Sequence, residues 1–303
     1  MKNIFVTGCA GYIGSHTCVE LLNENYNVIG LDNFSNSKKN VLDNITKITG
    51  KVINFYEGNM LDKDLLDKIF NENEIDAVID FAAFKSVGDS VSKPIEYYIN
   101  NVSSVLTLLS VMKKHNVKTL VFSSSATVYG DSKIMPITEE CKTGKTTNPY
   151  GTSKLYCEGI LQDLYKSDNE WNICIFRYFN PVGAHKSGLI GEEPNGIPAN
   201  LMPFISKVAT GELEILSVFG NDYNTIDGTG RGYSVLEMIK AFEIVNGVFV
   251  PYRIVGRRHG DIAICYADPS KAQKELNWKA ELELEDMCKD AYNFTKRLLK
   301  WLK

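Results

Sequence analysis

Tyr150 and Lys154 form the residue pair with the clearest chemical meaning in this sequence. The run Tyr-Gly-Thr-Ser-Lys places a phenol and an ammonium group four residues apart, so on a helix the two side chains share one face. A free tyrosine keeps its proton up to a pKa of about 10, and a nearby positive charge favours the phenolate. Lys154 can therefore make Tyr150 a usable base. Such pairs also arise by chance on amphipathic helices, so the pair alone does not establish a catalytic site.

A serine-rich strand end lies upstream of this pair. The string FSSSATVYG covers residues 122–130, and a hydroxyl at the carboxyl end of a parallel strand faces the ligand crevice. Ser125 is therefore expected to hydrogen-bond the reacting hydroxyl of a substrate. The alternative is an ordinary serine-rich turn, and without Tyr150 and Lys154 that alternative would be preferred.

A glycine-rich loop near the N-terminus predicts a phosphate site. Gly8, Gly11 and Gly14 form a Gly-x-x-Gly-x-x-Gly loop between a strand and a helix. This arrangement brings backbone N–H groups and a helix N-terminus to a pyrophosphate. Asp32 follows at the end of the second strand, where a carboxylate accepts both ribose hydroxyls of NAD and repels the extra phosphate of NADP. Three glycines alone could form a structural turn, and Asp32 alone could be a surface turn residue.

The elements that must position these residues alternate along the first half of the chain. Strand-like runs occur at residues 4–7, 28–32, 77–81, 119–122 and 173–176, with helix-like runs at 16–22, 61–70, 101–112 and 150–164. This order predicts an α/β fold with a doubly wound, mostly parallel Rossmann sheet. Irregular loops are expected at 183–203 and helices at 235–245 and 284–302. We expect an NAD-binding Rossmann domain at residues 1–180 and a smaller C-terminal α/β substrate lobe at residues 181–303.

Composition excludes several other classes of protein. A net charge of −4 over 303 residues argues against a nucleic-acid partner, and no apolar run reaches membrane-spanning length. Seven scattered cysteines without a Cys-x-x-Cys pair predict reduced thiols in the cytoplasm, with no disulfide framework. The four histidines lie far apart in sequence, so no metal site is expected.

Taken together, the three motifs resemble those of the extended short-chain dehydrogenase/reductase superfamily. Longer strings are similar to those of its UDP-glucose 4-epimerase family, and the similarity runs from residue 2 to about 290. These strings are GYIGSHT at 11–17, FAAFKSV at 81–87, YYINNV at 97–102, RYFNPVGAH at 177–185, NLMP at 200–203, FGNDY at 219–223 and RRHGD at 257–261.

This resemblance implies a role for each matching residue. Ser125 and Tyr150 would act on the sugar hydroxyl, and Lys154 would also hold the nicotinamide ribose. The residues that would contact NAD are Gly8, Gly11, Tyr12, Ile13, Gly14, Asp32, Asn33, Asn59, Met60, Phe81, Ala82, Lys85, Asn100, Lys154 and Tyr178. Those that would contact the UDP-sugar are Ser125, Tyr150, Asn180, Asn200, Leu201, Ser217, Phe219, Arg258, Asp261 and Cys265.

The implied reaction is the reversible interconversion of UDP-glucose and UDP-galactose with tightly bound NAD. A nucleotide-sugar 4,6-dehydratase is a second reading, but that class carries an Asp-Glu pair where this chain has Ala126 and Thr127. A non-catalytic or weakly active nucleotide-sugar-binding protein is a third. The family also implies a homodimer through the helical runs at 101–112 and 150–164, although their apolar spacing fits burial within one chain equally well.

Three departures from the family pattern stand out. Asn59 replaces the usual Asp, and Cys265 stands where some members carry Tyr. A small residue at that position accompanies acceptance of UDP-N-acetyl sugars in the family. The third departure lies at the 230/231 junction, where the chain passes from one Gly-Thr-Gly directly to Arg-Gly-Tyr-Ser-Val. Family members have a strand, a helix and a UDP-binding Arg between these points, and their absence supports the non-catalytic alternative.

Overall fold

The computed structural model describes residues 1–196, 198, 200–227, 232–257 and 263–301. Contacts within the chain divide it into two compact units. Unit 1 comprises Met1–Gly130 and Thr143–Tyr178, and unit 2 comprises Asp131–Lys142 and Phe179–Lys303. The segment Asp131–Lys142 is held in unit 2 by bonds such as that from the Ile137 N–H to the Tyr266 carbonyl, at 2.9 Å.

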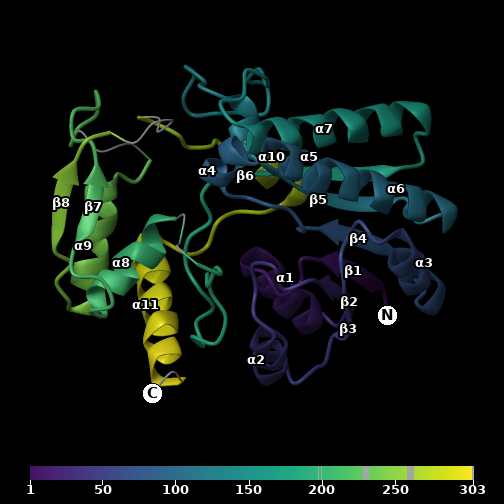
Figure 1. Ribbon diagram of the computed structural model, residues 1–303, viewed down its shortest axis with the longest axis horizontal. Coiled ribbons are helices and arrows are strands. Elements are labelled where there is room, and N and C mark those ends of the chain that lie inside the picture. The colour runs from purple at the N-terminus through teal and green to yellow at the C-terminus, as the bar shows by residue number, and fades with distance from the viewer. Residues whose placement is uncertain (197, 199, 228–231, 258–262, 302–303) are drawn as a thin grey trace. The chain divides into compact units, whose positions relative to one another are not determined.

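Unit 1 is built on one parallel sheet of six strands (Figure 1). The predicted doubly wound fold is confirmed: the spatial order is β3-β2-β1-β4-β5-β6, and it reverses direction between β1 and β4. Ligands of such sheets bind at the carboxyl ends of the strands near this reversal. The strands are β1 (Asn3–Thr7), β2 (Asn27–Asp32), β3 (Asn54–Glu57), β4 (Ala77–Asp80), β5 (Thr119–Ser125) and β6 (Asn172–Tyr178).

Helices cover both faces of this sheet, as a parallel sheet requires. One face packs against α3, α6 and α7 around a core that includes Phe5, Leu66, Leu108 and Leu161. On the other face lie α1 and α2 (Figure 1). The helices of unit 1 are α1 (Tyr12–Asn23), α2 (Asn40–Thr49), α3 (Lys63–Glu72), α4 (Val87–Ser92), α5 (Pro94–Tyr98), α6 (Ser104–Lys114) and α7 (Pro149–Ser167).

The helix predicted at 101–112 starts differently in the structure. A π-helical turn, Ile99–Ser103, precedes α6. Inside this turn the side chain of Asn101 is buried and bonds to groups outside the helix. Single π-turns of this kind are frequent at functional sites.

The core of unit 2 combines side chains from three of its described helices, α8, α9 and α11, with the two-stranded parallel sheet. This core includes Met202, Val218, Phe242, Val250 and Cys288. A capping box between Ser234 and Glu237 begins α9. The irregular region expected at 183–203 ends earlier, because α8 already starts at Leu201. The elements are α8 (Leu201–Ala209), β7 (Leu216–Phe219), α9 (Val235–Asn246), β8 (Tyr252–Val255), α10 (Ser270–Leu276) and α11 (Leu284–Trp301). Across the described ranges, no helix has both the length and the apolar character needed to cross a membrane.

Candidate active site

The glycine loop after β1 has the geometry of an anion cradle. Gly8 has a φ of +65° and donates its N–H to the Leu31 carbonyl at 2.8 Å. A Cβ on Gly14 would lie 2.1 Å from the Gly8 carbonyl oxygen, so only glycine lets α1 approach the loop this closely. No side chain caps the N-terminus of α1 at Gly11, and the first turn has no acidic residue. The helix dipole therefore favours an anion here.

Asp32 lies beside this loop and is held in a fixed orientation. Its carboxylate accepts hydrogen bonds from the Ala10 N–H at 3.0 Å, the Phe34 N–H at 2.8 Å and the Ser37 hydroxyl at 2.8 Å. The side chain of Asn33, which follows, accepts the Ser35 N–H at 3.0 Å. The sequence analysis missed Ser37, which orients Asp32 from five residues downstream.

A buried pair ties the end of β4 to the end of β1. The Thr7 hydroxyl donates to Asp80 at 2.5 Å and accepts the N–H groups of Phe81 and Ala82 at 3.2 Å each. Burial raises the pKa of Asp80 above its ordinary value. This pair, absent from the sequence prediction, fixes the backbone of Phe81 and Ala82 beside Gly8, since a Cβ on Gly8 would lie 3.0 Å from the Ala82 nitrogen.

The π-turn fixes the next part of the same loop. Asn101 accepts the Phe84 N–H at 2.8 Å and donates to the Phe84 carbonyl and the Ser153 hydroxyl, each at 3.0 Å. These bonds connect the loop carrying Lys85 and the turn carrying Asn100 to α7. The sequence singled out Asn100, whereas the structural anchor is its neighbour Asn101.

Asn59 and Met60 lie in the turn between β3 and α3. The Asn59 side chain accepts the Leu61 N–H at 2.9 Å. The Met60 side chain is 5% exposed and belongs to the core. Met60 therefore presents backbone, not side chain, to anything bound at this turn.

Tyr150 and Lys154 occupy the first two turns of α7. The helix begins with Asn148, whose side chain accepts the Gly151 N–H at 2.8 Å. Tyr150 is half-buried. The Lys154 ammonium is buried, lies 4.7 Å from the centre of the Phe122 ring and donates to the Ser123 carbonyl at 2.6 Å. Lys154 thus connects α7 to the strand that carries Ser125.

Ser125 ends β5 and begins the short 3-10 helix η2 (Ala126–Tyr129). Its hydroxyl oxygen accepts the Thr127 N–H at 3.2 Å and the Thr127 hydroxyl at 2.9 Å. A Cβ on Gly151 would lie 3.1 Å from Thr127, so the first turn of α7 packs directly on η2. The helix turn of Tyr150 and the strand end of Ser125 are therefore neighbours.

Tyr178 stands beside Ser125, its register partner across β5 and β6. Its ring lies 6.4 Å from that of Phe81 and 6.3 Å from that of Phe176, centre to centre. Burial raises the pKa of Tyr178 to about 12. Because of this raised pKa, the Tyr178 phenol keeps its proton, and its ring serves as an aromatic contact surface and not as a base.

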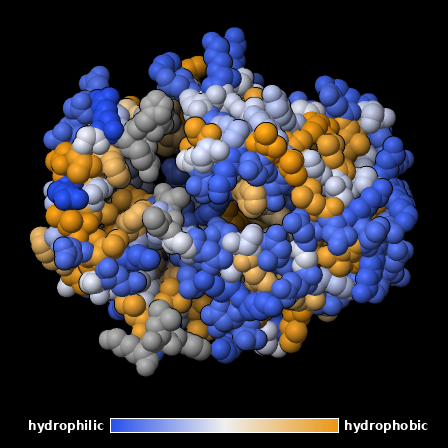
Figure 2. Space-filling model, in the orientation of Figure 1, coloured by the Kyte–Doolittle hydropathy of each residue, from blue (hydrophilic) through white to orange (hydrophobic). Residues whose placement is uncertain are grey.

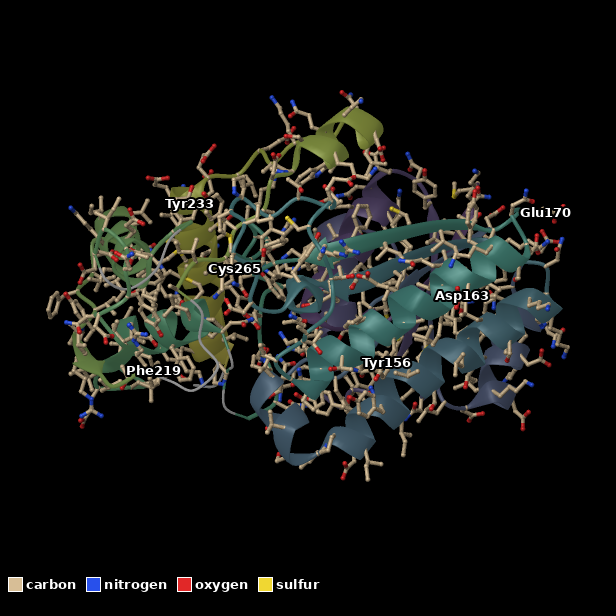
Figure 3. All side chains as sticks on the ribbon, turned by 90° about the horizontal axis from the view of Figure 1, so that it is seen from above. Tyr156, Asp163, Glu170, Phe219, Tyr233 and Cys265 are labelled. Atoms are coloured by element: carbon tan, nitrogen blue, oxygen red, sulfur yellow. The ribbon has the colours of Figure 1, made fainter. Side chains whose placement is uncertain are left out.

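Apart from Ser125 and Tyr150 of unit 1, the residues predicted for the UDP-sugar belong to unit 2. Asn180 is exposed, Leu201 packs against the core of the unit, Ser217 lies in β7, and Phe219 at its end is 42% exposed. Arg258 and Asp261 lie outside the described residues. Asn200 donates to Glu192 at 2.6 Å, a partner the sequence analysis missed. Cys265 is half-buried in the segment after β8 (Figure 3), and burial raises its thiol pKa.

No group of three or more His, Cys, Asp or Glu side chains that could hold a metal ion occurs in the described part of the chain. The features of unit 1 that could take part in chemistry are the glycine loop, the Ser125 hydroxyl and the Tyr150–Lys154 pair.

Known proteins resemble this chain in sequence and in fold. The model of the "NAD dependent epimerase/dehydratase family" matches residues 4–231. A UDP-glucose 4-epimerase of Pasteurella multocida is 55% identical, covering 97% of both chains. The crystal structure of a Bifidobacterium longum UDP-glucose 4-epimerase in complex with NAD+ and UDP superimposes with a TM-score of 0.94 at 52% identity, covering 98% of each chain. One from Stenotrophomonas maltophila, with bound NAD and formylated UDP-arabinopyranose, gives 0.96 at 42% identity, covering 99% of this chain and 100% of the other.

The same comparison measures what this chain lacks. The alignment with the Pasteurella multocida relative extends over 329 positions. It covers 97% of this chain, or about 294 of 303 residues, so about 35 residues of the relative have no counterpart in this chain. The junction suspected from the sequence, Gly230 to Arg231, lies outside the described residues. The family model matches most of this chain, so the chain belongs to the NAD dependent epimerase/dehydratase family, and its sequence groups with those of the UDP-glucose 4-epimerases.

Proposed function

We propose that this chain catalyses the reversible 4-epimerisation of UDP-glucose and UDP-galactose with NAD as its cofactor. The observation that carries the proposal is the junction of α7 with the end of β5, which brings the turns of Ser125 and Tyr150 together. Relatives with matched full-length sequences are UDP-glucose 4-epimerases. We assign the cofactor to residues 1–180 and the UDP-sugar to residues 181–303 together with Ser125 and Tyr150.

The glycine loop at the end of β1 fits a dinucleotide, because Gly8 and Gly14 occupy positions where a Cβ would crowd the neighbouring backbone. Bound NAD supplies the acceptor for the hydride of the sugar C4 and returns it to the opposite face. Tyr150 takes the proton of the 4-hydroxyl and gives it back after the sugar has turned, with the Ser125 hydroxyl bonded to the same oxygen. Lys154 lies one helical turn beyond Tyr150 on the same face of α7 and would orient the nicotinamide ribose.

An epimerase assay on protein purified with its cofactor tests this function directly. Conversion of UDP-galactose to UDP-glucose without added reductant or oxidant supports it. The extracted cofactor should be NAD, because the carboxylate of Asp32 would repel the 2′-phosphate of NADP. Binding of UDP-sugar without conversion would favour the non-catalytic alternative, and extraction of mainly NADP would contradict the cofactor assignment.

We further propose that UDP-N-acetyl sugars are additional substrates. The support is the small side chain of Cys265 at a position where some relatives have Tyr, whose phenol ring would fill the space that an N-acetyl group needs. Cys265→Tyr is expected to suppress conversion of UDP-N-acetylgalactosamine by about 10-fold or more, in line with the ~1–3 kcal/mol that a modest change in pocket size is worth. Activity on UDP-galactose should persist. Equal loss on both substrates would show that residue 265 does not select by size.

A homodimer through the helices of unit 1 is also proposed. Apolar side chains gather over α5 and α6 (Figure 2), where Ile95 is 69% and Leu106 49% exposed. Tyr156, 54% exposed on α7 (Figure 3), stacks on Tyr98 beside them, with ring centres 5.9 Å apart. Exposed apolar groups of this kind mark association surfaces. Ile95→Glu should convert the dimer to a monomer in sedimentation velocity, and a monomeric parent chain would contradict the proposal.

The cytoplasm is the proposed location. All seven cysteines are described and each is a free thiol, which suits a reducing compartment. Cell fractionation that finds the protein in an oxidising compartment would overturn this assignment.

A further inference from the structure

A buried ion pair joins α7 to the end of the sheet, next to the residues assigned to catalysis. Arg177 donates from Nε to Glu158 Oε1 at 3.0 Å and from Nη2 to Glu158 Oε2 at 2.8 Å. The Glu158 side chain is 1% exposed and that of Arg177 19%. Burial works against the charge on Arg177, but its bonds to Glu158 and Tyr129 outweigh this effect and raise the pKa of Arg177 above its ordinary value.

Two further contacts complete the network. Glu158 also accepts a hydrogen bond from the Ser124 hydroxyl. Arg177 donates to the Tyr129 hydroxyl at 2.8 Å, and its guanidinium carbon lies 4.8 Å from the centre of the Tyr129 ring. Four elements therefore meet at one ion pair: α7, β5, β6 and η2.

Three members of this network, Ser124, Arg177 and Glu158, stand close to residues of the proposed site. Ser124 precedes Ser125, and Arg177 precedes Tyr178. Glu158 lies one helical turn beyond Lys154, which itself lies one turn beyond Tyr150, so the three side chains share one face of α7. None of the network residues belongs to the set assigned to NAD or to the UDP-sugar.

Stability alone is a weak explanation for such a pair. Removing two charges from water is costly, and well-packed apolar side chains of similar volume often stabilise a protein as well or better. An apolar pair, however, does not fix the orientation of its partners. A bidentate Arg–carboxylate bond fixes the distance and the rotation of its partners. Here it fixes the position of α7 along β6, whose Arg177 pairs in register with Ser124 of β5.

We propose that Glu158 and Arg177 are positioning residues, which hold α7 in register with β5 so that Tyr150 and Ser125 address the same substrate oxygen. The inference rests on the proposed epimerase function. Small displacements of reacting groups cost about 10²-fold in rate, so loss of the register should lower kcat with little change in KM or NAD content.

Two variants separate positioning from simple stabilisation. Glu158→Gln leaves Arg177 buried without a countercharge and should lower both Tm and kcat. The double variant Glu158→Gln/Arg177→Met leaves no unpaired charge, keeps an acceptor for Ser124 and should regain most of the lost Tm. Its kcat should remain about 10²-fold below that of the parent chain. Asp67→Asn is the matched control, because it removes the carboxylate that pairs with Lys114 and contacts the His115 ring, and it should lower Tm without changing kcat.

Recovery of kcat together with Tm in the double variant would overturn the proposal. Hydrogen exchange gives an answer that does not depend on turnover: peptides covering residues 123–130 and 149–155 should exchange faster in the double variant than in the parent chain. Should the parent chain not epimerise at all, the proposed function fails by itself. Unchanged exchange in these two segments would then reject the positioning role, and faster exchange would sustain it.

Discussion

Replacing Tyr150 by Phe is expected to lower kcat for UDP-galactose by about 10²–10⁴-fold, the usual contribution of a positioned acid or base. Phe preserves the ring, and the N-terminus of α7 is fixed independently by Asn148 and Pro149. NAD should remain bound, because the glycine cradle and the Thr7–Asp80 pair do not involve Tyr150. The measurement is kcat with the NAD content of the same preparation.

Tyr165→Phe is the matched control for this substitution. Tyr165 lies on the same helix, 52% exposed near its C-terminal end, so the loss of its hydroxyl should leave kcat unchanged. Near-parental activity of Tyr150→Phe would remove Tyr150 from the mechanism. Tyr178 does not offer a ready substitute, since burial raises its pKa to about 12.

Local signals in the sequence were enough to predict the frame of unit 1. Strand, glycine loop and helix follow one another at 3–23, and the positions of Tyr150 and Lys154 on one helix follow from spacing alone. The confirmed sheet depends on apolar runs such as Ile4–Val6, which are buried on both faces. By contrast, β3 was missed because its residues are half-exposed or exposed and show no apolar run.

The supporting network could not be predicted, because its contacts join residues far apart in sequence. Asn101 bonds to Ser153, 52 residues away, and Ser124 to Glu158, 34 residues away. Asn101 lies in the string YYINNV, where only its neighbour Asn100 was given a role, and Glu158 lies in none of the strings cited for the family. The sequence therefore identifies the groups proposed to react, whereas the groups that orient them became visible only in three dimensions.

Restoring the segment that relatives have and this chain lacks should change both the stability of the protein and its affinity for UDP. Inserting the corresponding ~35 residues of the Pasteurella multocida relative between Gly230 and Arg231 is expected to raise Tm. The described sheet of unit 2 has two strands, and a sheet of that size has only marginal stability by itself. Its residues Phe219, Tyr252 and Ile254 are 42–47% exposed. A further strand and helix would cover apolar surface, against a total stability of only about 5–15 kcal/mol.

UDP binding gives the second measure of the same insertion. The family resemblance implies that the segment carries an Arg that contacts UDP. One charge-assisted bond is worth about 1.5–3 kcal/mol, or about one to two powers of ten in affinity. A Gly/Ser linker of equal length at the same junction is the control, and it should raise neither Tm nor the affinity measured by calorimetric titration with UDP. NAD content should be equal in all three proteins, because the cradle of unit 1 is complete without the segment. If the restored chain melts and binds UDP like the parent, the rest of unit 2 already closes its core and supplies the diphosphate contact, and the loss of the segment affects neither stability nor UDP binding.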